Sequence, residues 1–178
     1  MTEIAKKIDA CVRNVPDFPK PGVMFKDITP ILQNAQVFKE TIQTMAAQLK
    51  NENVRYVAGI ESRGFVFASA LALELGIGLV LLRKPGKLPW RTMKATYQLE
   101  YGTDAIEVHE DAVEKGDVIT IVDDLLATGG TAAAAASLLR EAGADVKKIL
   151  FVIELDFLKG RAKLNDAGFA HVESLVHY

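Results

Sequence analysis

The chain alternates between segments whose hydrophobic residues recur at helical spacing and short runs that are apolar throughout. Helical spacing predicts amphipathic helices, whereas a short, continuous apolar run predicts a strand that is buried on both faces. The pattern predicts helices at residues 2–13, 35–51, 64–75, 132–142 and 159–166. It predicts strands at residues 56–60, 77–82, 118–122, 148–155 and 171–176.

Strands and helices that alternate in this way are typical of an α/β fold. Because the strands are apolar on both faces, we expect a central, mostly parallel sheet flanked by helices. A length of 178 residues fits a single domain with a sizeable core. We expect an N-terminal region at residues 1–34 and the α/β core at residues 35–178.

Two segments fall outside the alternation. Pro16, Pro19 and Pro21 exclude a helix and favour an extended path with turns. The long stretch after residue 82 is rich in Lys, Arg, Pro and Gly at its start and then alternates polar and apolar residues. A long connection inside a compact domain is often a functional loop or a hairpin arm. We expect a flexible loop at about residues 84–107.

The charge balance argues against a polyanionic partner. The chain has 21 basic and 23 acidic residues, so its net charge is −2 and nothing global attracts it to nucleic acid or to an anionic membrane. No apolar run approaches the ~20 residues of a membrane span, and residues 1–10 lack the apolar core of a signal peptide. We therefore expect a cytoplasmic protein that binds neither nucleic acid nor membrane.

The most informative segment is residues 118–131, in which an apolar strand ends in Asp123 and Asp124 and a glycine-containing loop leads into a helix. Open parallel sheets bind ligands at the carboxyl ends of their strands, and the N–H groups at a helix start favour an anion. Two carboxylates could bind ribose hydroxyls directly or through Mg²⁺. The segment therefore predicts a sugar-phosphate site. Its loop residues are Ala127, Thr128, Gly129, Gly130 and Thr131.

This segment resembles the substrate-binding motif of type I phosphoribosyltransferases, which have a Rossmann-like fold and use 5-phosphoribosyl 1-diphosphate (PRPP). Residues 61–65, Glu-Ser-Arg-Gly-Phe, resemble the pyrophosphate loop of that family. The resemblance implies that Ser62 and Arg63 bind PRPP and that the Glu61–Ser62 peptide is cis. An arginine and backbone N–H groups suit a diphosphate leaving group.

Three further segments resemble the adenine phosphoribosyltransferases: residues 17–30, 83–89 and 99–102. The first resembles a small N-terminal hood that covers the base. The resemblance implies that Phe25 and Leu126 contact the two faces of adenine, with backbone groups around Val23, Met24 and Lys26 on its edge. Aromatic stacking supplies affinity, whereas main-chain hydrogen bonds supply selectivity.

The activity implied is transfer of the phosphoribosyl group of PRPP to adenine, giving AMP and pyrophosphate. Arg63, Lys87 and Mg²⁺ would neutralise the leaving group, with the metal bound mainly through PRPP and close to Asp123 and Asp124. Glu100 would accept the proton of the base. By resemblance, Tyr101 helps to close the loop, Arg83 reaches a neighbouring subunit's site and the protein is a homodimer.

Two alternatives stay open at this stage. The first is a phosphoribosyltransferase for another base, such as hypoxanthine, guanine, xanthine or orotate, against which the hood argues. The second is a non-catalytic regulator that senses PRPP or purine. Such regulators usually carry an added DNA-binding domain, for which 178 residues leave little room.

Overall fold

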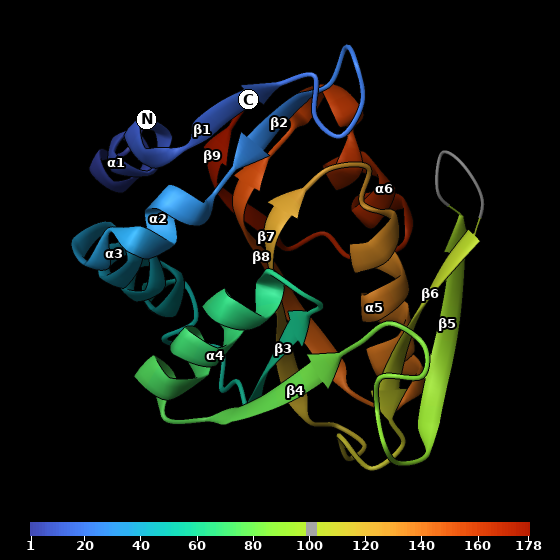
Figure 1. Ribbon diagram of the computed structural model, residues 1–178. Helices are drawn as coiled ribbons and strands as arrows, with labels where there is room; N and C mark the ends of the chain where they lie inside the picture. The colour runs from blue at the N-terminus through green and yellow to red at the C-terminus, as the bar shows by residue number, and fades with distance from the viewer. Residues whose placement is uncertain (99–102) are drawn as a thin grey trace.

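The computed structural model describes residues 1–98 and 103–178. Alternating strands and helices dominate the chain, as the apolar pattern predicts (Figure 1). The elements, in chain order, are α1 (Glu3–Cys11), β1 (Arg13–Pro16), β2 (Met24–Asp27), α2 (Thr29–Gln33), α3 (Ala35–Ala47), β3 (Tyr56–Ile60), α4 (Gly64–Leu75), β4 (Gly78–Leu82), β5 (Thr92–Gln98), β6 (Thr103–His109), β7 (Val118–Leu126), α5 (Gly130–Glu141), β8 (Asp145–Glu154), a 3₁₀ turn (Asp156–Leu158), α6 (Gly160–Asp166) and β9 (Val172–His177).

The central sheet has five strands in the order β4-β3-β7-β8-β9, and every neighbouring pair is parallel. Helices α3 and α4 lie on one side of it, and α5 lies on the other (Figure 1). This arrangement confirms the expected α/β class. The crossover helices cover both faces of the sheet, which is why its strands are continuous apolar runs.

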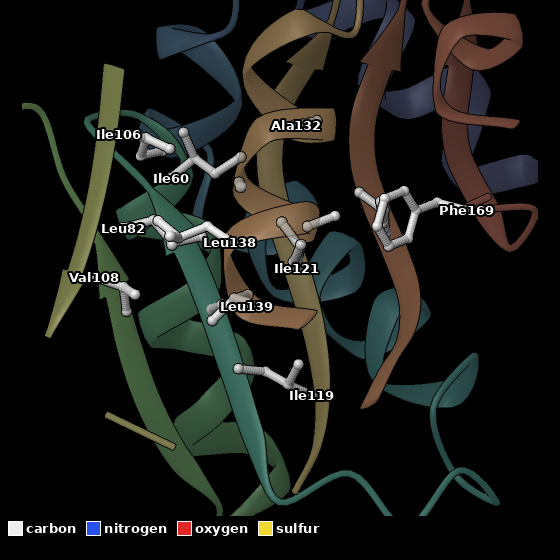
Figure 2. Close-up of a cluster of buried hydrophobic side chains, with 14 of the residues drawn as sticks. Ile60, Leu82, Ile106, Val108, Ile119, Ile121, Ala132, Leu138, Leu139 and Phe169 are labelled. Atoms are coloured by element: carbon white, nitrogen blue, oxygen red, sulfur yellow. The ribbon is translucent and has the colours of Figure 1, made fainter. Parts of the chain in front are cut away.

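Each face of the sheet carries its own hydrophobic core. On the α5 side, Ile60, Ile121 and Phe151 pack with residues of α5 and of the β5–β6 hairpin, as Figure 2 shows in part. On the α3–α4 side, Val57 and Val122 pack with residues of the helices that precede β4 in the chain. Successive strand residues point to opposite faces, so both cores draw on the same strands. The sheet is thereby held in place from both sides.

The N-terminal region forms a separate two-stranded sheet, which we call the hood (residues 13–27). Strands β1 and β2 are antiparallel, with Val15 opposite Phe25 and Asn14 opposite Lys26. The expected extended path is present, but the apolar pattern predicted neither the two strands nor α2. Each strand has only four residues and lacks a clear alternation of apolar and polar residues. The strands are therefore recognised by their backbone pairing with each other and not by a pattern in the sequence.

Residues 92–98 and 103–109 form the two antiparallel strands of a hairpin, in which β5 and β6 pair from Thr92–His109 to Gln98–Thr103. The hairpin packs against α5, and Tyr97, Ile106 and Val108 are buried there. The expected loop at residues 84–107 is therefore largely a hairpin arm in this structure. Its flexibility stays a prediction, and its tip at residues 99–102 lies outside the described residues.

Most element boundaries agree with the sequence pattern to within a few residues. Helix α4 ends at Gly76, which is left-handed with a φ of 66° and caps the helix as glycine commonly does. Helix α3 ends at Ala47 rather than residue 51, and β7 continues to Leu126 rather than residue 122. The extension of β7 has a consequence for the site, because it places two acids and two leucines inside the strand. Within residues 1–98 and 103–178, no helix is long and apolar enough to cross a membrane.

Candidate active site

The site lies where the carboxyl ends of β3 and β7 meet. These strands are neighbours in the sheet, with Gly59 opposite Val122, so the segments that follow them converge. They enclose a cavity of about 240 Å³. Its walls are mostly polar, and they are formed by Ile60, Glu61, Ser62, Arg63, Lys84, Asp123, Asp124, Leu125 and Thr131.

A second, smaller hollow of about 80 Å³ adjoins it at the loop between β7 and α5. Residues 127–131 line this hollow, together with the last residues of β7. Helix α5 begins at Gly130 with no side-chain hydrogen bond at its N-cap. The N–H groups of a first helical turn have no partner within the helix, and they favour a bound anion.

The loop requires glycine at residue 129. Its φ is 76°, and a Cβ atom there would lie 2.5 Å from the carbonyl oxygen of Gly160, at the start of α6. Glycine alone combines that backbone conformation with such a close approach. The contact between Gly129 and Gly160 fixes the loop against α6 and shapes the anion hollow.

The two acids at the end of β7 differ in their surroundings. Asp124 is buried and accepts a hydrogen bond on Oδ2 from Nε of Arg63, over 2.5 Å. Asp123 accepts the N–H of Asp124 on Oδ1. Desolvation and the neighbouring Asp124 raise the pKa of Asp123 well above its ordinary value. The pair therefore favours one shared proton or a cationic neighbour.

Arg63 connects this acidic pair to the hood. Its guanidinium carbon lies 5.8 Å from the centre of the Phe25 ring, within the range of a cation–π contact. The Phe25 ring in turn meets Phe18 edge-on, with 5.0 Å between the ring centres. Phe25 thus lies over the same region as the acids, although it is far from them in sequence.

The segment after β4 closes the cavity on another side. Arg83 donates from Nε and Nη2 to the two carboxylate oxygens of Glu61, over 3.1 and 3.2 Å. This pairing, with the N–H of Lys84 as a further donor, lowers the pKa of Glu61. The backbone oxygen of Lys87 accepts from Nη1 of Arg83. The loop after β3 and the segment at residues 83–87 are therefore tied together.

Lys84 also reaches the hairpin. Its Nζ donates to the hydroxyl of Tyr97 over 2.9 Å and pairs closely with the carboxylate of Asp104. Tyr97 and Asp104 are opposite each other in the β5–β6 pairing, one pair before the last described pair of the hairpin. The ammonium group holds the pKa of Asp104 below its ordinary value. Lys84 thus bridges the cavity and both hairpin strands beneath the tip.

A larger hollow lies elsewhere on the surface. It has a volume of about 440 Å³ and lies between α3 and the end of α4. Lys50 and Glu74 are the charged residues that line it. It has neither paired acids nor a glycine loop at a helix start. The smaller cavity at the ends of β3 and β7 is therefore the better candidate, on chemistry rather than size.

Comparison with known proteins identifies the family of the chain. The model of the phosphoribosyl transferase domain family matches residues 28–168. The adenine phosphoribosyltransferase of Roseiflexus sp. (strain RS-1) is 54% identical over 153 residues, which cover 86% of this chain and 89% of that protein. The chain belongs to the adenine phosphoribosyltransferase family.

Solved structures of adenine phosphoribosyltransferases superpose on almost the whole chain. The enzyme of Thermoanaerobacter pseudethanolicus is 47% identical with a TM-score of 0.93, and the match covers 98% of this chain and 99% of that one. The enzyme of Saccharomyces cerevisiae, solved with D-2,5-dideoxy-2,5-imino-altritol 1,6-bisphosphate and adenine, is 42% identical with a TM-score of 0.92. The match with the yeast enzyme covers 98% of this chain and 99% of the yeast chain.

The structure brings together most of the residues that the resemblance to adenine phosphoribosyltransferases singled out. Ser62, Arg63, Asp123, Asp124 and Thr131 line one cavity. The remaining phosphate-loop residues line the adjoining hollow, and Phe25 lies beside Arg63. The peptide between Glu61 and Ser62 is cis, as expected for this family. Glu100 and Tyr101 lie outside the described residues.

Leu126 is the expected base contact that the geometry does not favour. Its side chain is 1% exposed and packs in the hydrophobic core, close to Gly160. The half-buried Leu125 lines the cavity instead. The two leucines belong to different cores: Leu126 packs on the α5 side and also lines the hollow at residues 127–131, whereas Leu125 packs on the α3–α4 side. Alternation along the strand could not have chosen between them, because Asp123 and Asp124 are adjacent and both line the cavity.

Two other cavity residues were missed. Glu61 and Lys84 both line the site. From the sequence alone, a charged residue in either segment would be assigned to the surface. Their roles depend on contacts between segments at least 20 positions apart: Glu61 with Arg83, and Lys84 with Asp104. The sequence holds no signal for such pairs beyond the resemblance of the segments that carry them.

Proposed function

We propose that this chain transfers the 5-phosphoribosyl group of PRPP to adenine, with release of pyrophosphate and formation of AMP. The observation that carries the proposal is one cavity at the ends of β3 and β7. It combines Arg63, a pair of acids and a glycine loop at a helix start. These are the groups that a diphosphate, a ribose and a 5′-phosphate require. That a similar enzyme was solved with adenine supports the choice of base.

The phosphoribosyl group would lie along the end of β7. The 5′-phosphate would occupy the hollow formed by residues 127–131, where backbone N–H groups and the hydroxyls of Thr128 and Thr131 donate to it. Asp123 and Asp124 would accept hydrogen bonds from the ribose hydroxyls. This assignment would bring the reacting C1 carbon to the acidic end of β7, beside Arg63, which is where base and leaving group must meet.

The base would lie between Phe25 of the hood and Leu125 of β7. Phe25 offers an aromatic face, and the half-buried Leu125 faces the cavity. Backbone groups around Val23, Met24 and Lys26 would bond the edge of adenine. The side chain of Met24 is 53% exposed, so it is not buried among other residues. Recognition of adenine by the backbone groups at this position does not depend on that side chain.

The leaving group would be neutralised by cations around the cavity. Arg63 lines it directly, and Lys87 and Arg83 stand on the segment that closes it. Mg²⁺ would be held mainly through the phosphate oxygens of PRPP, since Asp124 is already paired with Arg63 and Asp123 is desolvated. The carboxylates nearby fit a hard cation. When bound, the metal would offset the charge that develops on pyrophosphate.

The reaction also needs a proton acceptor. As the C1–N9 bond forms and the C1–pyrophosphate bond breaks, adenine loses the proton of N9. We propose Glu100 as the base that accepts it and Tyr101 as a residue that closes the site. In the sequence both follow β5, whose Tyr97 receives a hydrogen bond from Lys84 of the cavity. Residues that follow a strand so close to the site are suited to cover the substrates.

A homodimer fits the apolar surface beside the site. Val66 and Leu73 of α4 and Leu79 and Leu81 of the edge strand β4 are all exposed. Apart from Ser69 and Glu74, helix α4 is apolar around its circumference, which is typical of a helix that is covered on all sides. We propose that a second copy of the chain covers this face. Arg83 follows β4 directly, and in such a dimer it would lie near the interface.

Measurement of pyrophosphate release from PRPP and adenine tests the proposal. If the chain is the proposed enzyme, pyrophosphate release should depend on both substrates and on Mg²⁺, and AMP should form in equal amount. A purine-sensing regulator would bind the ligands without release. A transferase for another base would release pyrophosphate only when that base replaces adenine.

A further inference from the structure

Tyr178 is fixed in place by three different parts of the fold. Its N–H donates to the carbonyl of Glu154, and its own carbonyl accepts the N–H of Asp156, both over 2.9 Å. Its hydroxyl donates to Oδ1 of Asp9 in α1 over 2.7 Å. Burial, followed by this bond to Asp9, raises the pKa of Tyr178, so the phenol stays neutral at ordinary pH. The ring is therefore a rigid, uncharged surface at the edge of the sheet.

Lys26 of the hood lies on that surface. Its Nζ is 3.6 Å from the centre of the Tyr178 ring, which is a close cation–π distance. Both side chains are half-buried. A cation over a ring with little access to water is attracted more strongly than one on an open surface. This contact links residues 152 positions apart in the chain, 26 and 178.

The hood has no strand pairing with the central sheet. Strands β1 and β2 pair only with each other, so besides their connections to α1 and α2, side-chain contacts set the position of the hood over the cavity. Lys26 is next to Phe25 in β2, and the two point to opposite sides of that strand. Phe25 thus lies beside Arg63 while Lys26 lies on Tyr178.

We propose that Tyr178 is a positioning residue for the base. Through Lys26 it fixes β2 so that Phe25 and the backbone of residues 23–26 stand where adenine binds. Tyr178 itself touches no substrate. The inference rests on the proposed function, because it assumes that β2 carries the base site. It predicts that loss of the ring weakens adenine binding and leaves the PRPP site at the end of β7 unaffected.

Steady-state kinetics of the full chain with Tyr178→Leu and Tyr178→Phe test this. Tyr178→Leu removes the aromatic face, and we expect the KM for adenine to rise about 3- to 10-fold, the scale of a partly desolvated cation–π contact. The KM for PRPP and kcat should stay within about twofold of wild type. Tyr178→Phe keeps the ring and loses only the bond to Asp9, so its KM for adenine should be close to that of wild type.

A double-mutant cycle with Lys26→Met separates positioning from general stability. If the two side chains act through each other, Lys26→Met should raise the KM for adenine as Tyr178→Leu does, and the double variant should be no worse than either alone. Urea midpoints of all variants report whether folding is affected. A purely structural Tyr178 would lower the midpoint and leave both KM values unchanged, which overturns the inference.

The same data distinguish failure of this inference from failure of the proposed function. If wild type releases no pyrophosphate with adenine and PRPP, the function is wrong. If wild type is active and Tyr178→Leu has an unchanged KM for adenine, only the positioning role is wrong. A rise in both KM values by the same factor would likewise reject it, because the ring would then support the whole site rather than the hood.

Discussion

Arg63 and Asp124 pair with each other across the site, with Nε of the arginine donating to Oδ2 of the buried aspartate over 2.5 Å. The arginine stands in the loop after β3, and the aspartate lies two residues before the end of β7. This pair therefore couples the loop proposed to bind pyrophosphate to the acids proposed to bind the ribose. Binding of PRPP would engage both partners, one at each side of the bond that breaks.

Asp124→Asn should weaken PRPP binding much more than adenine binding. The amide keeps the shape of the side chain but loses the charge that orients Arg63, and charge-assisted hydrogen bonds are about twice as strong as neutral ones. We expect the KM for PRPP to rise at least ~10-fold and the KM for adenine to change less than about twofold. Asp145→Asn, at an exposed surface ion pair with Lys147, is the control and should change neither value. Equal losses for both substrates would remove the assignment.

Leu125→Ala and Leu126→Ala form a matched pair. Leu125 lines the cavity, so its truncation should raise the KM for adenine with a small effect on unfolding. Leu126 is 1% exposed in the core, so its truncation should lower the free energy of unfolding by about 2–5 kcal/mol, as large-to-small core substitutions do. Denaturant titration and kinetics of both variants check this. The reverse pattern would restore Leu126 as the base contact.

Adenine should be preferred over hypoxanthine and guanine by at least ~100-fold in kcat/KM. A site built to pair the 6-amino group leaves buried polar groups unpaired when a 6-oxo base enters, and mispairing of that kind costs two orders of magnitude or more. A panel of bases at fixed PRPP measures the ratio. Comparable turnover of hypoxanthine would leave only the broader phosphoribosyltransferase assignment.

Glu100→Gln should lower kcat by roughly 10²–10⁴-fold, the usual contribution of general acid–base catalysis. Because the lost interaction belongs to the transition state, the KM for adenine should change little. Glu110→Gln, an exposed glutamate after β6, serves as the control and should be fully active. An effect of Glu100→Gln on KM alone would make Glu100 a binding residue instead.

The Glu61–Arg83 pair should make stability depend on pH in the acid range. Arg83 lowers the pKa of Glu61 from its ordinary value of 4.5, so the pair stabilises the folded state fully above that value. The stabilisation is lost as the pH falls below 4.5 through the lowered pKa. Glu61→Gln should therefore have a lower urea midpoint than wild type at pH 6–7, and the two midpoints should converge in acid. A difference that does not depend on pH would show that the ion pair contributes nothing measurable.

The sequence by itself determined the class of the fold and predicted where a phosphate loop would lie. Both follow from local chemistry: continuous apolar runs require a sheet covered on two faces, and a glycine loop at a helix start offers N–H groups that favour an anion. The cis peptide at Glu61–Ser62 and the base-binding role of the hood came from resemblance, because single residues there carry no distinctive pattern.

The tertiary structure decided which side chains reach the cavity. Leu125 rather than Leu126 lines the cavity at the ends of β3 and β7, because Leu126 packs in the core on the α5 side and Leu125 packs on the α3–α4 side. Lys84 meets Asp104, and Lys26 meets Tyr178, only because separate elements pack side by side. Contacts between distant segments depend on how whole elements pack, and no local sequence pattern encodes that packing.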